Sequence, residues 1–122
     1  MSAGQWPKTW KRYPYHRKAN RDAWDSREAH RQTARNQKAQ YNPYLYHTDQ
    51  QIAAAELGCV NHGTLIAEWL HKKTFFLKTD HVVGCDKGEE TSYLFAEWHA
   101  CGDVHGRPIS ESELRRLGVT LP

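Results

Sequence analysis

The sequence predicts an α+β protein, in which helices and antiparallel strands occupy separate stretches of the chain. Residues 17–40 contain neither Gly nor Pro and are rich in Ala, Arg, Lys and Gln, a composition that favours a helix. Residues 74–83 and 91–101 are apolar, β-branched and aromatic, and a Gly-containing segment joins them, as in a long hairpin. Ser110 followed by Glu113 has the spacing of a helix capping box near the C-terminus.

The chain divides by composition into two predicted parts, a basic aromatic arm at 1–46 and a small globular domain at 47–122. The arm holds ten Lys and Arg against three Asp and Glu, a net +7, whereas the remainder holds seven against eleven, a net −4. Ile, Leu, Val and Phe first occur at Leu45, so the core is expected to form from the later residues. Such charge asymmetry is typical of an arm that binds a polyanion.

Within the arm, residues 1–16 contain Pro7 and Pro14 and are expected to be extended. Residues 17–40 are expected to form one helix that is polar on every side, because Trp24 is the only large apolar residue in it. Asn42-Pro43 then ends that helix.

The domain is expected to begin with two helices. Thr48 or Asp49 caps the first, which should end at Gly58, and a second helix is expected over residues 63–73. Beyond them come the hairpin, with Gly84 and Gly88 in its turn, and a short terminal helix closed by Gly118.

The helix pair resembles the helix-turn-helix of DNA-binding regulators, although its turn is one residue longer than usual. The positions that match the pattern are Ile52, Ala53, Ala54, Leu57, Gly58, Thr64, Leu65, Trp69 and Leu70. The resemblance implies that the second helix enters the major groove and presents Asn61, His62, Thr64 and Glu68. An ordinary antiparallel helix pair in a small core is the alternative.

The arm indicates the same class of function, since Lys and Arg neutralise phosphates and aromatic rings stack on unpaired bases. Residues 17–40 also resemble the arginine-rich helices that fold on structured RNA. The sequence therefore predicts a non-enzymatic nucleic-acid-binding protein, a small phage or mobile-element regulator. The predicted contacts are Trp6, Lys8, Trp10, Lys11, Arg12, Arg17, Lys18, Arg21, Arg27, Arg31, Arg35, Lys38, Asn61, His62 and Thr64.

Two other uses of the arm stay open. A small inhibitor or adaptor of the anti-defence type would dock on a protein or nucleoprotein complex through Trp6, Trp10 and Trp24, because Trp and Arg are frequent interface hot spots. Alternatively, the arm folds back on the acidic domain of its own chain.

The Cys and His residues suggest a structural zinc ion. Cys59-x-x-His62 and Cys101-x-x-x-His105 have suitable pair spacings, and His99 is a competing ligand. A metal-dependent enzyme built on Glu97, His99, Asp103 and His105 is a third hypothesis, but no nucleophile elbow or phosphate loop accompanies them. Enzymatic activity is therefore not predicted.

The expected location is the cytoplasm, with no membrane partner. The chain has no long apolar run and no signal-like apolar segment near its start. Its three cysteines, an odd number, indicate a reducing compartment rather than a disulfide framework.

Overall fold

A computed structural model describes residues 6–12, 17–36 and 38–122 and confirms the α+β class. None of the helices in these ranges has the length and apolar character required to cross a bilayer. In chain order the elements are β1 (Thr9–Trp10), β2 (Arg17–Lys18), α1 (Arg21–Asp25), α2 (Glu28–Asn36), β3 (Gln40–Tyr41), α3 (Asp49–His62), β4 (Thr64–Glu68), β5 (Lys72–Lys78), β6 (Gly84–Asp86), β7 (Glu89–Thr91), β8 (Tyr93–His99), β9 (Asp103–Ile109) and α4 (Glu111–Arg116).

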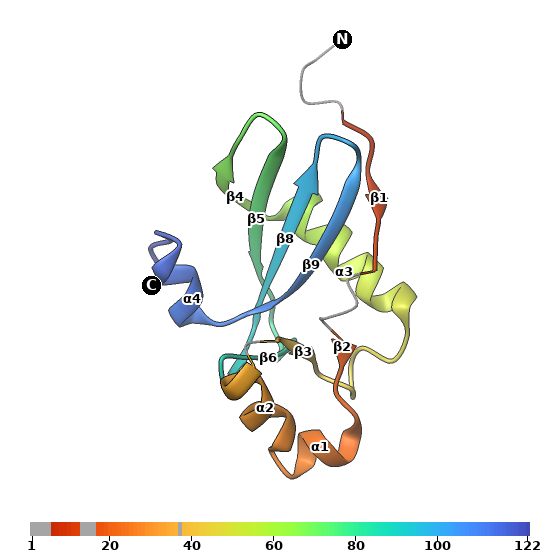
Figure 1. Ribbon diagram of the computed structural model, residues 1–122, viewed down its shortest axis with the longest axis vertical. Coiled ribbons are helices and arrows are strands. Elements are labelled where there is room, and N and C mark those ends of the chain that lie inside the picture. Colours follow the sequence, from red (N-terminus) through yellow and green to blue (C-terminus); the bar gives the residue numbers. More distant parts are fainter. Residues whose placement is uncertain (1–5, 13–16, 37) are drawn as a thin grey trace.

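The main sheet has the strand order β1-β9-β8-β5-β4, and α3 crosses one of its faces (Figure 1). Because side chains alternate along a strand, every second residue of β8 and β9 points toward α3. The core on this side joins side chains of the helix to those of the strands. Its buried members include Ile52, Cys59 and Val60 of α3 and Leu94, Ala96, Trp98 and Val104 of the sheet.

The opposite face of the main sheet is covered in part by α4. Leu114 of α4 is buried there against Tyr93, Phe95 and Ile109, and Ile66 of β4 packs against the same cluster. The rest of this face, near the start of β5, the end of β8 and the start of β9, holds the polar side chains described below.

The described residues of the predicted arm at 1–46 contribute to both sheets and to the core. β1 pairs with β9, and β2 and β3 join β6 and β7 in a second sheet of order β2-β3-β6-β7. Tyr41 is fully buried in the main core, and Trp6 and Trp10 pack against it. Figure 1 shows α1 and α2 beside the second sheet, at the end of the molecule away from the β4–β5 turn.

The second helix predicted at residues 63–73 does not form, so the geometry of a helix-turn-helix is not present there. The first helix starts as expected, with Thr48 and Gln51 completing a capping box, but α3 continues through Gly58 to His62. The chain then enters β4, which pairs antiparallel with β5. The hydrogen-bonded ladder with a neighbouring strand overrides the local helical pattern.

The single helix predicted at residues 17–40 is divided into α1 and α2. Asn20 caps α1, and Arg27 between the two helices has a left-handed backbone with φ of 64°. The Ser26 hydroxyl oxygen accepts a bond from the Glu28 amide at 3.4 Å. Ser commonly competes with helix hydrogen bonds in this way and redirects the chain.

The pairing of the two predicted strands and the terminal helix are confirmed, but both strands are shorter at the connecting end than expected, and Gly84 lies in β6 rather than in the turn. β5 and β8 pair along their whole lengths, and between them β6 and β7 form a small hairpin whose turn residues Lys87 and Gly88 have φ of 56° and 82°. The Ser110 side chain accepts the Glu113 amide at the start of α4. Strand β9 was not predicted, because a Gly and a Pro lie within it.

Candidate metal centre

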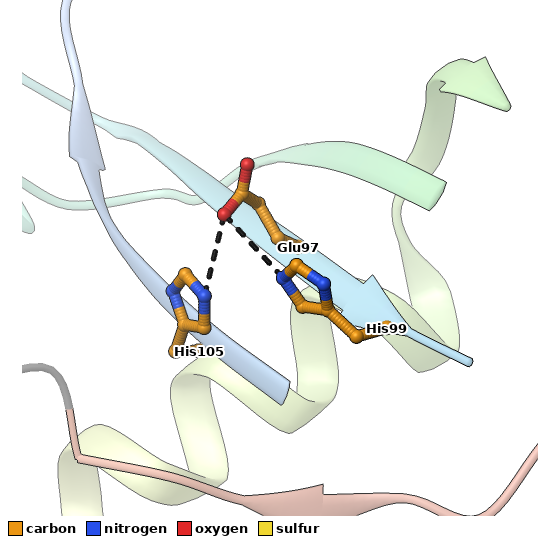
Figure 2. Close-up of side chains that lie close together, drawn as sticks. All are labelled: Glu97, His99 and His105. Carbon is orange, nitrogen blue, oxygen red and sulfur yellow. Dashed lines mark ion pairs between the residues drawn. The ribbon is translucent and has the colours of Figure 1, made fainter. Parts of the chain in front are cut away.

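Three metal-ligating side chains meet on the face of the main sheet that points away from α3. Glu97 and His99 alternate with the core residues of β8, and His105 on β9 is the register partner of Glu97. The Glu97 carboxylate lies between the two imidazoles (Figure 2), with Oε2 3.3 Å from His105 Nε2 and 3.7 Å from His99 Nε2. One donor atom from each residue lies within 4.8 Å of the others.

These separations suit a single ion. Zinc binds imidazole nitrogen and carboxylate oxygen at about 2.0–2.1 Å, which places neighbouring ligands of a tetrahedral site about 3.3 Å apart. The two imidazole rings are nearly parallel, with centroids 5.4 Å apart and planes 22° apart.

Neighbouring groups orient the carboxylate. Lys72 donates to Glu97 Oε1 at 3.3 Å, which leaves Oε2 directed at the histidines. A lysine in this position steadies a carboxylate ligand as outer partners of metal sites do. His99 Nε2 is buried and has no hydrogen-bond partner among the described residues. A buried polar nitrogen without a bond is costly, and a metal ion would satisfy it.

The surroundings of His105 favour the neutral form of its imidazole. Burial is the largest cause and lowers its pKa, with His99 adding to the lowering and Glu97 opposing it. An imidazole must be neutral to offer its nitrogen lone pair to an ion. At neutral pH this histidine is therefore ready to serve as a ligand.

A cavity of about 430 Å³ adjoins two of the three residues, Glu97 and His105. Glu97 and His105 form part of its wall, together with Lys72, Arg107 and the exposed indole of Trp69. A ligand in this space would lie directly beside an ion held at the cluster.

The zinc ligands predicted from the Cys and His pairs are not brought together. The Cys59 thiol is buried on the α3 side of the sheet, and its Sγ lies 3.6 Å from the Leu94 carbonyl oxygen. Cys101 and His62 are exposed, so of the four only His105 joins the cluster. Asp103, which was grouped with the strand-end residues, pairs instead with Lys11 at 3.6 Å.

Several cations that were expected to contact nucleic acid have partners within the chain. Lys8 donates to Asn61 Oδ1 at 2.8 Å, and Arg12 lies 3.6 Å from Asp49. Lys18 donates to the His47 carbonyl at 2.6 Å. The alternative in which the arm folds back on the domain therefore agrees with these contacts.

The two aromatic residues expected to stack on bases are used inside the molecule. Trp6 meets Trp98 edge to face with ring centroids 5.3 Å apart. Trp10 packs against the core and donates from Nε1 to Glu56 at 2.8 Å. Tyr13 and Tyr15 lie outside the described residues.

The remaining predicted contacts belong to separate segments of the chain. Thr64 is exposed on β4 rather than at the start of a recognition helix, and Lys38 is exposed before β3. Arg21 lies over the ring of Tyr44, with its Cζ 5.1 Å from the ring centroid. Arg17 lies in β2.

Three arginines expected to contact nucleic acid share one exposed region. Arg27 precedes α2 and Arg31 and Arg35 lie on it, spaced four residues apart, with side chains 60%, 56% and 65% exposed. This spacing places Arg31 and Arg35 along one side of α2, and Arg27 lies just before its first turn. All three side chains are more than half exposed and are therefore accessible to a partner.

Two residues of the cavity, Lys72 and Arg107, were not recognised from the sequence. Arg107 follows His105 by two positions, and Lys72 is the register partner of His99. The available signal was alternation, since His105 and Arg107 point to the same face once residues 103–109 are taken as a strand. Gly106 and Pro108 are unfavourable in a strand, so the sequence did not indicate a strand there.

The fold and this site define an α+β protein with a candidate metal centre of two histidines and one carboxylate beside an open cavity. No protein-family model, curated protein or solved structure matches the chain. The function is therefore inferred from the geometry of the site.

Proposed function

We propose that the protein binds one divalent transition-metal ion through Glu97, His99 and His105 and presents it to a ligand in the adjoining cavity. The observation that carries the proposal is the convergence of three donor atoms within 4.8 Å, from two strands whose register fixes their positions. The unbonded Nε2 of His99 and the support of Glu97 by Lys72 agree with it.

The donor set indicates the kind of ion. Two imidazole nitrogens and one carboxylate oxygen suit a borderline metal such as Zn²⁺, and the same set holds catalytic zinc in hydrolases. Three protein ligands leave at least one coordination position for water or substrate. A zinc-bound water has a pKa near 7, so metal-assisted hydrolysis is the reaction class that this arrangement supports.

Equilibrium dialysis against Zn²⁺ tests the proposal, and one ion per chain is expected. Replacing His99 or His105 with Ala should weaken binding more than about 100-fold, because losing an outer partner alone costs roughly 10–100-fold. His62→Ala is the matched control, since His62 is exposed at the end of α3. Equal zinc binding by all four proteins, or no binding by any, would contradict the proposal.

Thermal unfolding gives an independent readout of the same site. Zinc at 100 times its dissociation constant should raise the free energy of unfolding by about 2.7 kcal/mol. The stabilisation should vanish in His99→Ala and persist in His62→Ala. This comparison also shows whether each variant is folded before metal is added.

Nucleic-acid binding remains a second candidate function, supported by Arg27, Arg31 and Arg35. Their acidic neighbours are Glu28, 2.9 Å from Arg31 and from Arg35, and Glu90, 3.8 Å from Arg27. Exposed ion pairs of this kind contribute only about 0–1 kcal/mol. A phosphate backbone could therefore displace them at small cost.

A salt-titrated gel-shift assay with DNA and RNA tests this second candidate. Three phosphate contacts give a slope of about −2.7, so the association constant should fall roughly 40-fold between 50 and 200 mM salt. Replacing the three arginines with Gln should abolish that dependence, whereas Arg115→Gln on α4 should preserve it. Absent or salt-insensitive binding by the intact protein rejects the candidate.

A further inference from the structure

The cavity beside the cluster has an apolar wall and a charged wall. Ile66, Trp69, Phe95 and Leu117 supply apolar surface, and two of these are well exposed, Trp69 at 54% and Leu117 at 42%. Exposed apolar surface within a concave site is typical of ligand pockets. The apolar wall fits a flat or branched hydrocarbon group.

The charged wall consists of strand residues that point to the same side as the cluster. Lys72 lies over the indole of Trp69, with its Nζ 4.9 Å from the ring centroid, so the cation and the ring are adjacent. The Arg107 guanidinium lies over the ring of Phe95, with its Cζ at 5.1 Å. Arg107 and the predicted ligand His105 are two residues apart on β9, hence about 6.6 Å along the strand.

Charge balance at the cavity depends on the ion. Arg107 is 3.5 Å from the buried carboxylate of Asp86, and Glu113 is paired with Arg116. Lys72 offsets Glu97 at 3.3 Å. The charged residues that line the cavity, Lys72, Glu97, Arg107 and Glu113, sum to zero, and a divalent ion would add a charge of about +2, which favours an anion.

We infer that the cavity binds a small organic oxyanion whose head group reaches the metal ion and Arg107 and whose apolar group lies on Trp69 and Phe95. This inference rests on the proposed metal-binding function. Guanidinium groups bind carboxylates and phosphates through paired hydrogen bonds, so both head groups belong to the class. Binding of the anion requires the metal, because the empty site has no excess positive charge.

The test uses full-length protein loaded with Co²⁺, whose visible absorption changes when a new ligand enters the coordination sphere. Phenyl phosphate, benzoate and inorganic phosphate are titrated as probes, and binding of the same probes to metal-free protein is measured by calorimetry. Phenyl phosphate and benzoate should change the spectrum and bind more tightly than inorganic phosphate. The metal-free protein should bind none of them.

Variants separate the two walls. Arg107→Gln should weaken both aryl anions by about tenfold or more, as expected for a lost charged hydrogen bond. That variant also leaves Asp86 without its cation. A second variant, Arg107→Lys, keeps the positive charge but cannot form the paired hydrogen bonds of a guanidinium group, and it should weaken binding of both aryl anions by a smaller factor. Trp69→Ala should weaken phenyl phosphate without affecting inorganic phosphate, whereas Leu70→Ala, at a neighbouring exposed position, should change neither.

The outcomes for the two proposals differ. A normal Co²⁺ spectrum that no anion alters, or anion binding that is equally strong without metal, overturns the oxyanion inference and leaves the metal site intact. Failure to bind Co²⁺ or Zn²⁺ overturns both. If only inorganic phosphate changes the spectrum, and Trp69→Ala does not affect that change, the inference that the ligand carries an apolar group is rejected.

Discussion

At the scale of single residues, Glu56 is a buried polar side chain that contacts several elements. It is a carboxylate on α3 that accepts three hydrogen bonds, from the Tyr41 hydroxyl at 2.5 Å, from Trp10 Nε1 at 2.8 Å and from the Gly106 amide at 2.8 Å. A side chain at Gly106 would not fit, because its Cβ would lie 2.2 Å from the Phe95 carbonyl oxygen and 3.2 Å from Glu56 Cγ. One buried acid thus joins the arm, α3 and β9.

Burial raises the pKa of Glu56 above its usual value of 4.5, while the bonds from Tyr41, Trp10 and Gly106 oppose that rise. A folded-state pKa above the unfolded one means that the folded state binds the proton more strongly. The resulting stabilisation is complete below about pH 4.5 and is lost as the pH rises through the folded-state pKa.

We therefore expect the free energy of unfolding of the natural protein to fall, relative to Glu56→Gln, as the pH rises above 4.5. The slope cannot exceed about 1.4 kcal/mol per pH unit for one proton. Urea unfolding of both proteins from pH 4.5 to 7.5 measures the difference, with Glu68→Gln at an exposed position of β4 as control. A constant difference across this range would show that the carboxylate has the same pKa in both states.

At the scale of elements, residues 63–73 show why one apolar pattern predicts the wrong structure. Leu65, Ile66, Trp69 and Leu70 have helical spacing, yet Leu65 and Ile66 lie in β4 while Trp69 and Leu70 lie in the turn before β5. The edge of β5 offers an unpaired row of backbone groups to this segment. Pairing with that edge outweighs a local preference of a few tenths of a kcal/mol per residue.

The start of α3, in contrast, was predicted because a cap acts within a few residues. Thr48→Ala should lower the free energy of unfolding by about 1 kcal/mol, since the side chain satisfies the Gln51 amide. Thr120→Ala, at an exposed position outside helices and strands, should stay within about 0.5 kcal/mol of the natural protein. Chemical denaturation measures both, and equal values would show that the cap contributes no stability.

At the scale of the whole molecule, the N-terminal arm completes the fold rather than preceding it. It supplies the edge strand β1, two strands of the second sheet and the buried ring of Tyr41. Its positive charges lie against acidic and carbonyl groups of the domain, for example Arg12 beside Asp49 and Lys11 beside Asp103. The compositional division into +7 and −4 is therefore in part a complementarity within one fold.

A chain that starts at Tyr41 should accordingly lose cooperative unfolding. Removing Trp6 and Trp10 alone should cost about 3–5 kcal/mol each, against a total stability of about 5–15 kcal/mol for a domain. Circular dichroism in increasing urea measures the loss, and a synthetic peptide of residues 1–40 added in trans should restore part of the transition. A sharp transition at the urea midpoint of the intact protein would show that residues 41–122 fold alone.

The sequence by itself determined the α+β class, the caps of α3 and α4, the pairing of β5 with β8 and the grouping of Glu97, His99 and His105 as possible metal ligands. Those signals are local, since a cap, a turn or an alternating run depends on residues a few positions apart. The tertiary structure decided that β9 lies beside β8, which sets His105 opposite Glu97, and that the arm enters both sheets. Contacts between distant residues depend on which strand edges pair and which apolar faces pack together. A pattern of neighbouring residues does not specify those partners.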